Sequence, residues 1–159
     1  MKGELIGGLA LLSGYINKVR SEEENVLYVI SGDMLQGSLI DSEYRGVSTM
    51  EIMNYLAPDV VSLGNHEFDY GEANLKDRME QANFKWVCAN VETSASVIPQ
   101  PNPYITISIN DIRVSFLGLV ETDGKKNDII PSTHPWRVQN LTFQNPEDVV
   151  ALYSDVKEE

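Results

Sequence analysis

The sequence contains very little cysteine and histidine. Its 159 residues include one cysteine, Cys88, and two histidines, His66 and His134. A single cysteine allows no internal disulfide. Cys88 lies in the apolar run WVCA at residues 86–89, so we expect it to be a small buried residue of the core.

Long apolar runs and positive charge are also scarce. No apolar run approaches the roughly 20 residues of a membrane-spanning helix, and no secretory leader is visible. Twelve Lys and Arg residues oppose 24 Asp and Glu residues, giving a formal net charge of −12. Because proteins hold nucleic acid by neutralising phosphates, this charge disfavours long DNA or RNA. A mononucleotide stays compatible, since bound metal ions reverse the field within a cleft.

Apolar periodicity predicts alternating helices and strands within one domain. The expected helices cover residues 5–20, residues 52–56 behind a capping box at 48–51, a segment around 75–82, and a short final helix opened by Pro146. The expected strands cover residues 26–30, 59–63 and 117–119, and an antiparallel hairpin turns at Asn110-Asp111.

Two of these strands run into polar loops that contain glycine. The strand at 26–30 leads into GDMLQG at residues 32–37, and the strand at 59–63 leads into GNHEFDYG at residues 64–71. Since α/β proteins build sites at the carboxyl ends of strands, we expect Asp33, Asn65 and His66 to meet at one sheet edge. Carboxylate, amide oxygen and imidazole suit divalent ions such as Mg, Mn, Zn or Fe. The loops therefore predict a metal-assisted hydrolase.

The two motifs, in this order and spacing, resemble the calcineurin-like metallophosphoesterases, specifically the branch of 5′-nucleotidases and 2′,3′-cyclic-nucleotide phosphodiesterases. The resemblance extends from residues 7–10 to residues 141–143, nearly the whole chain. It implies an α/β fold, a layered sandwich with a mixed sheet. Residues 1–159 would form one partial catalytic domain.

The resemblance also implies roles for individual residues. Asp33 would be a carboxylate that bridges two divalent metal ions, and Asn65 would be a side-chain ligand to one of them. His66 would be the catalytic imidazole beside the scissile phosphate, and Asp69 would orient it. Such an arrangement serves an in-line displacement on phosphorus, with the imidazole stabilising or protonating the leaving alkoxide. The implied substrate is a nucleotide phosphate ester.

Several family motifs are missing. Family members carry an Asp-x-His pair on a first strand, and an isolated His and a Gly-His-x-His motif downstream, none of which is present. We expect an internal piece of a larger, often exported enzyme, lacking the first strand and the C-terminal metal-ligand segment. Asp33 and Asn65 are two clear ligands, with Glu67 or His66 as further contacts, so metal binding by this chain alone should be weak or absent. Localisation of the chain is left open.

The missing first strand would also expose a sheet edge. The strand at 26–30 would then offer unpaired backbone N–H and C=O groups, which recruit other strands. We therefore expect self-association through this edge.

Simpler roles exist for the same residues. Asp33 suits a turn cap, Asn65 a left-handed loop position, and Asp69 the start of a turn. A non-catalytic relative that binds a nucleotide, or an interaction fragment of the same fold, therefore stays open as an alternative function. A binder would need neither His66 nor Asp69, so this pair favours catalytic ancestry.

Two further polar residues are weaker candidates. His134 lies between two prolines and matches no ligand motif, so we interpret it as an ordinary loop residue. Gln36 shares the Asp33 loop and is a candidate for contacting substrate or positioning the loop, without being a metal ligand.

Overall fold

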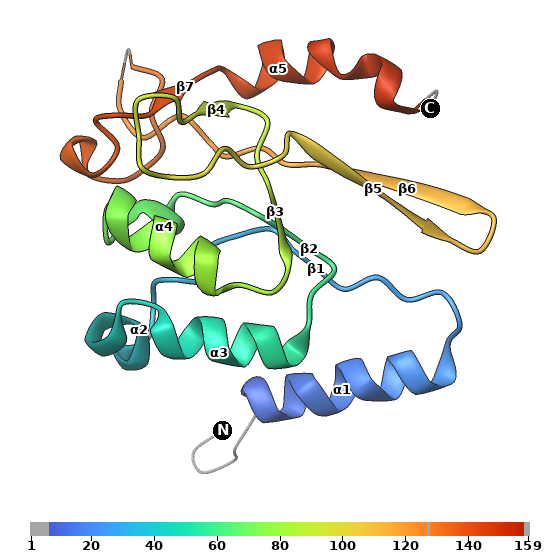
Figure 1. Cartoon of the computed structure of the whole chain (residues 1–159). Helices are drawn as coiled ribbons and strands as arrows, with labels where there is room; N and C mark the ends of the chain where they lie inside the picture. Colours follow the sequence, from blue (N-terminus) through green and yellow to red (C-terminus); the bar gives the residue numbers. More distant parts are fainter. Residues whose placement is uncertain (1–6, 127, 158–159) are drawn as a thin grey trace.

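Three short runs rich in apolar residues form a parallel sheet at the centre of the molecule (Figure 1). The structure is a computed structural model that describes residues 7–126 and 128–157. The sheet order is β1-β2-β3, and the register pairs Val29 with Val60 and Val61 with Trp86. Within the described residues, the strands are β1 (Val29–Ile30), β2 (Val60–Ser62), β3 (Lys85–Val87), β4 (Val91–Glu92), β5 (Tyr104–Ile109), β6 (Ile112–Leu117) and β7 (Thr142–Phe143).

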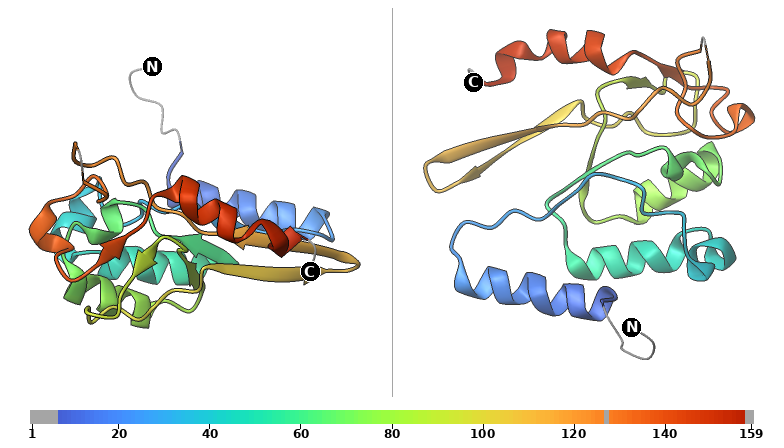
Figure 2. Two further views of the ribbon diagram at one scale, coloured as in Figure 1. Left: turned by 90° about the horizontal axis from the view of Figure 1, so that it is seen from above. Right: turned by 180° about the vertical axis from the view of Figure 1, so that it is seen from behind.

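Helices lie on both sides of this sheet, in layers that Figures 1 and 2 show. In chain order they are α1 (Leu9–Glu22), α2 (Leu39–Tyr44), α3 (Val47–Leu56), α4 (Glu72–Gln81) and α5 (Pro146–Leu152), with the 3₁₀ turns η1 (His66–Phe68), η2 (Pro135–Arg137) and η3 (Ser154–Lys157). The outermost helix, α1, is tied to the end of α3 because the Arg20 guanidinium donates to the carbonyls of Leu56 (3.1 Å) and Ala57 (2.7 Å). The β5–β6 hairpin and α5 lie on the opposite side.

The main core lies between the parallel sheet and the elements that follow it. It joins Val61 of β2, Leu75 of α4 and Phe143 of β7, and Phe68 is fully buried among them. Phe68 meets Phe143 edge-on, with ring centroids 5.6 Å apart. Burying such a side chain contributes about 1.5–3 kcal/mol. Since Phe68 belongs to η1, its burial anchors the loop that carries the candidate site residues.

Several sequence predictions about local structure are confirmed. Cys88 is fully buried, as expected of a core residue. The hairpin has the expected two-residue turn, and Asn110 adopts a left-handed φ of 48° there. The helices around residues 75–82 and after Pro146 are present as α4 and α5.

The predicted capping box is wrong. Helix α3 begins at Val47, and its N-cap is Gly46 with a φ of 82° and no side-chain cap. Ser48 therefore lies inside the helix rather than before it. The short helix α2, which ends at Tyr44, was not predicted, because its six residues are too few to show periodicity.

The predicted strand bounds and the mixed sheet also need correction. The run at 26–30 is a strand only at Val29–Ile30, since the Tyr28 N–H donates to the Asp59 carboxylate (2.8 Å) instead of to a backbone carbonyl of a neighbouring strand. The run at 117–119 is a strand only at Leu117, the last residue of β6, since the Gly118 N–H donates to the Pro103 carbonyl (3.1 Å) and the Gly118 carbonyl accepts from the Ala89 N–H (2.7 Å), outside the β5–β6 ladder. The antiparallel strands form two separate ladders, β4–β7 and β5–β6.

The predicted apolar face of α1 is largely uncovered. Ile16 is its only buried residue within the described helix, while Leu9 and Leu12 are exposed. Leu5, which was expected to extend this face, lies outside the described residues.

Strand β1 is the outer strand of the parallel sheet. Its described partner is β2, and Val29 is 39% exposed. Self-association through this edge stays a prediction. Among the described helices, none has the length and apolarity needed to cross a membrane.

Candidate active site

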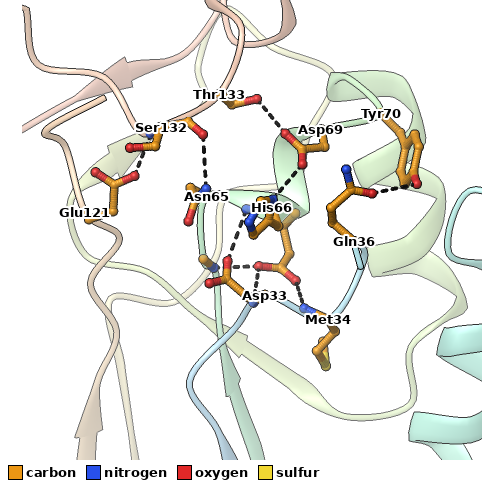
Figure 3. A network of polar contacts seen from close by, with 12 residues as sticks. Asp33, Met34, Gln36, Asn65, His66, Asp69, Tyr70, Glu121, Ser132 and Thr133 are labelled. Carbon is orange, nitrogen blue, oxygen red and sulfur yellow. Dashed lines mark hydrogen bonds and ion pairs between the residues drawn. The ribbon is translucent and has the colours of Figure 1, made fainter. Parts of the chain in front are cut away.

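Strands β1 and β2 run parallel, so the loops that follow them begin at the same sheet edge (Figure 3). The backbone N–H of His66 donates to the Asp33 carboxylate at 3.1 Å, and Asn65 is the preceding residue. The prediction that Asp33, Asn65 and His66 converge is therefore confirmed as geometry. Asp33 is exposed, whereas Asn65 and His66 are half-buried, so the cluster faces solvent.

Two glycines allow the loops to approach this closely. Gly32 has a φ of 98°, and a Cβ there would overlap the backbone nitrogen of Gly64. A Cβ on Gly64 would in turn overlap the Asp33 carboxylate. The glycines that precede Asp33 and Asn65 are thus needed for the backbones of the two loops to touch.

Glu67 joins the two loops from beneath. It is fully buried, and its carboxylate accepts backbone N–H groups from Asp33 (2.8 Å), Met34 (2.6 Å) and Gly64 (2.7 Å). Burial raises the pKa of the Glu67 carboxyl, and these three donors oppose that rise. Because the raised pKa applies only to the folded state, the contribution of this group to folding weakens as pH rises from the ordinary pKa to the raised one. The suggested role of Glu67 as a metal contact is wrong, since both of its oxygens are engaged by backbone.

His66 and Asp69 form a dyad on the solvent side of η1. The Nδ1 atom of His66 lies 2.7 Å from an Asp69 carboxylate oxygen, and the other Asp69 oxygen accepts from the Thr133 hydroxyl at 2.9 Å. The hydrogen bond to Asp69 raises the pKa of His66, opposed by partial desolvation and supported by the charges of Asp69, Asp33 and Glu67. A carboxylate on Nδ1 leaves Nε2 to face a ligand, and a raised pKa favours the imidazolium that can donate a proton.

We expect Asp69→Asn to lower the pKa of His66, because the amide accepts a hydrogen bond without its negative charge. The dyad stabilises the folded chain below the ordinary histidine pKa, and that stabilisation is lost as pH rises through the raised value. NMR titration of the imidazole protons, with a chelator present, measures the shift. Asp111→Asn, an exposed change in the hairpin turn, is the matched control. An unchanged His66 pKa in Asp69→Asn would contradict the assigned cause.

A segment distant in sequence completes the site. The Asn65 side-chain N–H donates to the Ser132 carbonyl (3.0 Å), and the Ser132 N–H donates to Glu121 (2.5 Å). Together with Thr133, Ser132 holds the Asn65 and Asp69 side chains in place. These residues were missed because residues 121–140 carry no motif or periodicity.

The two weaker candidates lie in different places. The Gln36 amide oxygen accepts from the Tyr70 hydroxyl at 3.1 Å, so Gln36 links the two loops, as one of its suggested roles required. His134 takes no part in the hydrogen bonds of the Asp33 cluster and stacks on Trp136, with ring centroids 4.2 Å apart.

The side chains at this edge fit a partial divalent-metal site. The described residues contain no group of three or more His, Cys, Asp and Glu side chains arranged around one metal position. The exposed Asp33 carboxylate forms no ion pair with a described Lys or Arg. The Asn65 side-chain nitrogen donates to the Ser132 carbonyl, so the amide oxygen of Asn65 points away from Ser132. Carboxylate and amide oxygens suit hard divalent ions. Asp33 and Asn65 therefore fit as two members of a larger ligand set.

Comparison with known proteins gives one family. Residues 4–156 match the calcineurin-like phosphoesterases. The chain is 31% identical over 155 residues to the 5′-nucleotidase of Rattus norvegicus, covering 95% of this chain and 26% of that protein. It thus spans about a quarter of the length of this relative.

Two solved structures are similar. A 5′-nucleotidase precursor from Thermus thermophilus superposes with a TM-score of 0.81 and 30% identity, covering 96% of this chain and 30% of that one. The NAD nucleotidase of Haemophilus influenzae has a TM-score of 0.82 at 23% identity, covering 96% and 30%, which shows a common fold. Because the family match spans most of the sequence and the fold agrees, the chain belongs to the calcineurin-like phosphoesterase family and is related to 5′-nucleotidases over part of their length.

Proposed function

We propose that residues 1–159 form part of the catalytic domain of a metal-dependent phosphoesterase that hydrolyses nucleotide phosphate esters, as a 5′-nucleotidase does. The observation that carries this proposal is the His66–Asp69 dyad, 2.7 Å across, beside the exposed Asp33 carboxylate at the sheet edge. A simple structural loop would not need an imidazole oriented by a carboxylate beside a second, exposed carboxylate that forms no ion pair with a described Lys or Arg. Relatives of similar sequence are 5′-nucleotidases, which supports a nucleotide substrate.

The proposed mechanism assigns a task to each side chain. Asp33 and Asn65 would hold two divalent ions, Zn, Mn, Mg or Fe, together with ligands from elsewhere in an intact enzyme. When bound, such ions supply an activated water and neutralise charge on the phosphoryl group. His66 donates a proton from Nε2 to the leaving alkoxide, while Asp69 holds its Nδ1 and fixes the ring. Thr133 keeps Asp69 from rotating. Export of the intact enzyme and weak metal binding by the chain alone stay predictions.

Asp33→Asn should weaken metal binding by about tenfold or more in an intact enzyme containing this chain, because an amide replaces the anionic ligand. Calorimetric titration with Mn²⁺ and the metal dependence of AMP hydrolysis measure the loss. Asp111→Asn, which also removes one exposed carboxylate, is the control and should leave both unchanged. Equal metal affinity in Asp33→Asn and the parent would refute the ligand assignment. If the intact enzyme binds a nucleotide but hydrolyses it with none of the ions Zn, Mn, Mg and Fe, the result supports the non-catalytic alternative instead.

A further inference from the structure

A concave site lies beside the dyad, and neither Asp33 nor Asn65 lines it. It is a groove of about 670 Å³ between the end of α2, the start of α4 and η2. Arg45, Arg137 and Trp136 line it, and Asp69 and Glu72 belong to its wall. In Figures 1 and 2, α2, α4 and the orange turn that contains η2 lie on the same side of the molecule. This volume falls within the range of small-molecule sites.

The acidic groups of the groove are already engaged by donors other than its arginines. One oxygen of Glu72 accepts the Asn140 backbone N–H (3.0 Å), and the other accepts the Asn140 amide (3.2 Å) and the Ser96 hydroxyl (2.7 Å). Both oxygens of Asp69 are engaged in the dyad contacts given above. These carboxylates therefore hold the walls of the groove together and do not pair with its arginines.

The two arginines of the groove have free guanidinium groups. Within the part of the chain that the structure describes, neither the Arg45 nor the Arg137 guanidinium forms a hydrogen bond or an ion pair. The chain carries a net charge of −12, so acidic partners are abundant elsewhere on it. Two planar donor groups facing one groove are suited to a phosphate or carboxylate, which they can bind with paired, charge-assisted hydrogen bonds.

Trp136 adds a flat apolar surface to the same groove. It is 65% exposed, and one face of its ring is supported by His134 in a nearly parallel stack, with an interplanar angle of 12°. An exposed tryptophan held by a second ring has little side-chain freedom left to lose. Stacking of a planar ring on such a surface is a common way for proteins to hold a base without hydrogen bonds to it.

We propose that this groove binds a small phosphorylated molecule with a planar aromatic ring, with the phosphate on Arg45 and Arg137 and the ring on Trp136. Nucleoside monophosphates belong to this chemical class. The groove shares Asp69 with the dyad, but Asp33, Asn65 and His66 do not line it, and the inference does not depend on the proposed catalytic function. The proposed binding contacts come only from cationic and aromatic side chains, so binding at this groove needs no metal ion.

The test is a binding titration on the 159-residue chain in the presence of EDTA, followed by tryptophan fluorescence excited beyond the adenine absorption band. AMP, adenosine and inorganic phosphate are the probes. We expect saturable quenching by AMP, with adenosine and phosphate each binding at least about tenfold more weakly. Trp136→Phe should abolish the signal, since the other tryptophan, Trp86, is buried.

Charge variants assign the binding to this groove. Arg45→Gln and Arg137→Gln should each weaken AMP binding by about tenfold, and Arg113→Gln on the exposed hairpin, which removes the same charge, should not. Asp33→Asn should bind AMP as the parent chain does, which separates this site from the catalytic proposal. The inference is overturned if quenching is unsaturable, if the two groove variants bind normally, or if binding requires Asp33.

Discussion

Replacing His66 by alanine should lower kcat for nucleotide hydrolysis by about 10²–10⁴-fold in an intact enzyme that contains this chain. His66 is the one described side chain at the sheet edge that pairs with a carboxylate through Nδ1 and leaves Nε2 open. Its loss removes proton donation to the leaving alkoxide and leaves Asp33 and Asn65 in place. Metal content should therefore stay at the parent level, while turnover of AMP falls.

The measurement needs kcat, KM and metal content from the same preparations. Arg113→Ala, a truncation of comparable size on the exposed hairpin, controls for expression and folding. Asp69→Asn should give a smaller loss than His66→Ala, since the imidazole is then present but less well oriented. If His66→Ala keeps a kcat near that of the parent, or if its lower kcat is explained by lost metal, His66 is not the proton donor. A substrate with a leaving group that needs no protonation should recover part of the rate.

Replacing Glu67 by alanine should destabilise the chain by about 3 kcal/mol or more, because one buried and two partly buried N–H donors lose their acceptor, at about 1–3 kcal/mol for each donor that water does not reach. The donors belong to Asp33, Met34 and Gly64, so the change separates the two loops as well as weakening the fold. Glu67→Gln should cost about 1–3 kcal/mol, since it keeps the volume but places an NH₂ group against one N–H. Urea unfolding followed by circular dichroism measures both losses.

The control for this pair is an exposed glutamate. Glu51 on α3 is exposed, and Glu51→Ala and Glu51→Gln should change the free energy of unfolding by less than about 0.5 kcal/mol. If Glu67→Ala unfolds at the same urea concentration as Glu51→Ala, the Glu67 carboxylate is not what joins the loops. A functional readout follows as well, since Glu67→Gln in an intact enzyme should impair metal binding through displacement of Asp33.

The sequence by itself determined, to within one residue, where β1 and β2 end and which polar loops follow them. Apolar runs followed by glycine and polar residues indicate where strands end, and paired parallel strands must deliver their loops to the same edge. That reasoning placed Asp33 beside His66 correctly. The family resemblance also implied that Asp69 orients His66, and the structure places the two side chains 2.7 Å apart.

Only the tertiary structure decided what supports these residues. Glu67 lies inside the motif, yet whether its carboxylate faces solvent or the backbone of another loop depends on how closely the loops pack. Ser132 and Thr133 reach Asn65 and Asp69 across more than 60 positions of chain, and no local pattern encodes that pairing. The groove with Arg45 and Trp136 likewise combines three distant segments. Local sequence determines strand ends through short-range sterics and periodicity, whereas contacts between distant segments depend on the packed core that brings them together.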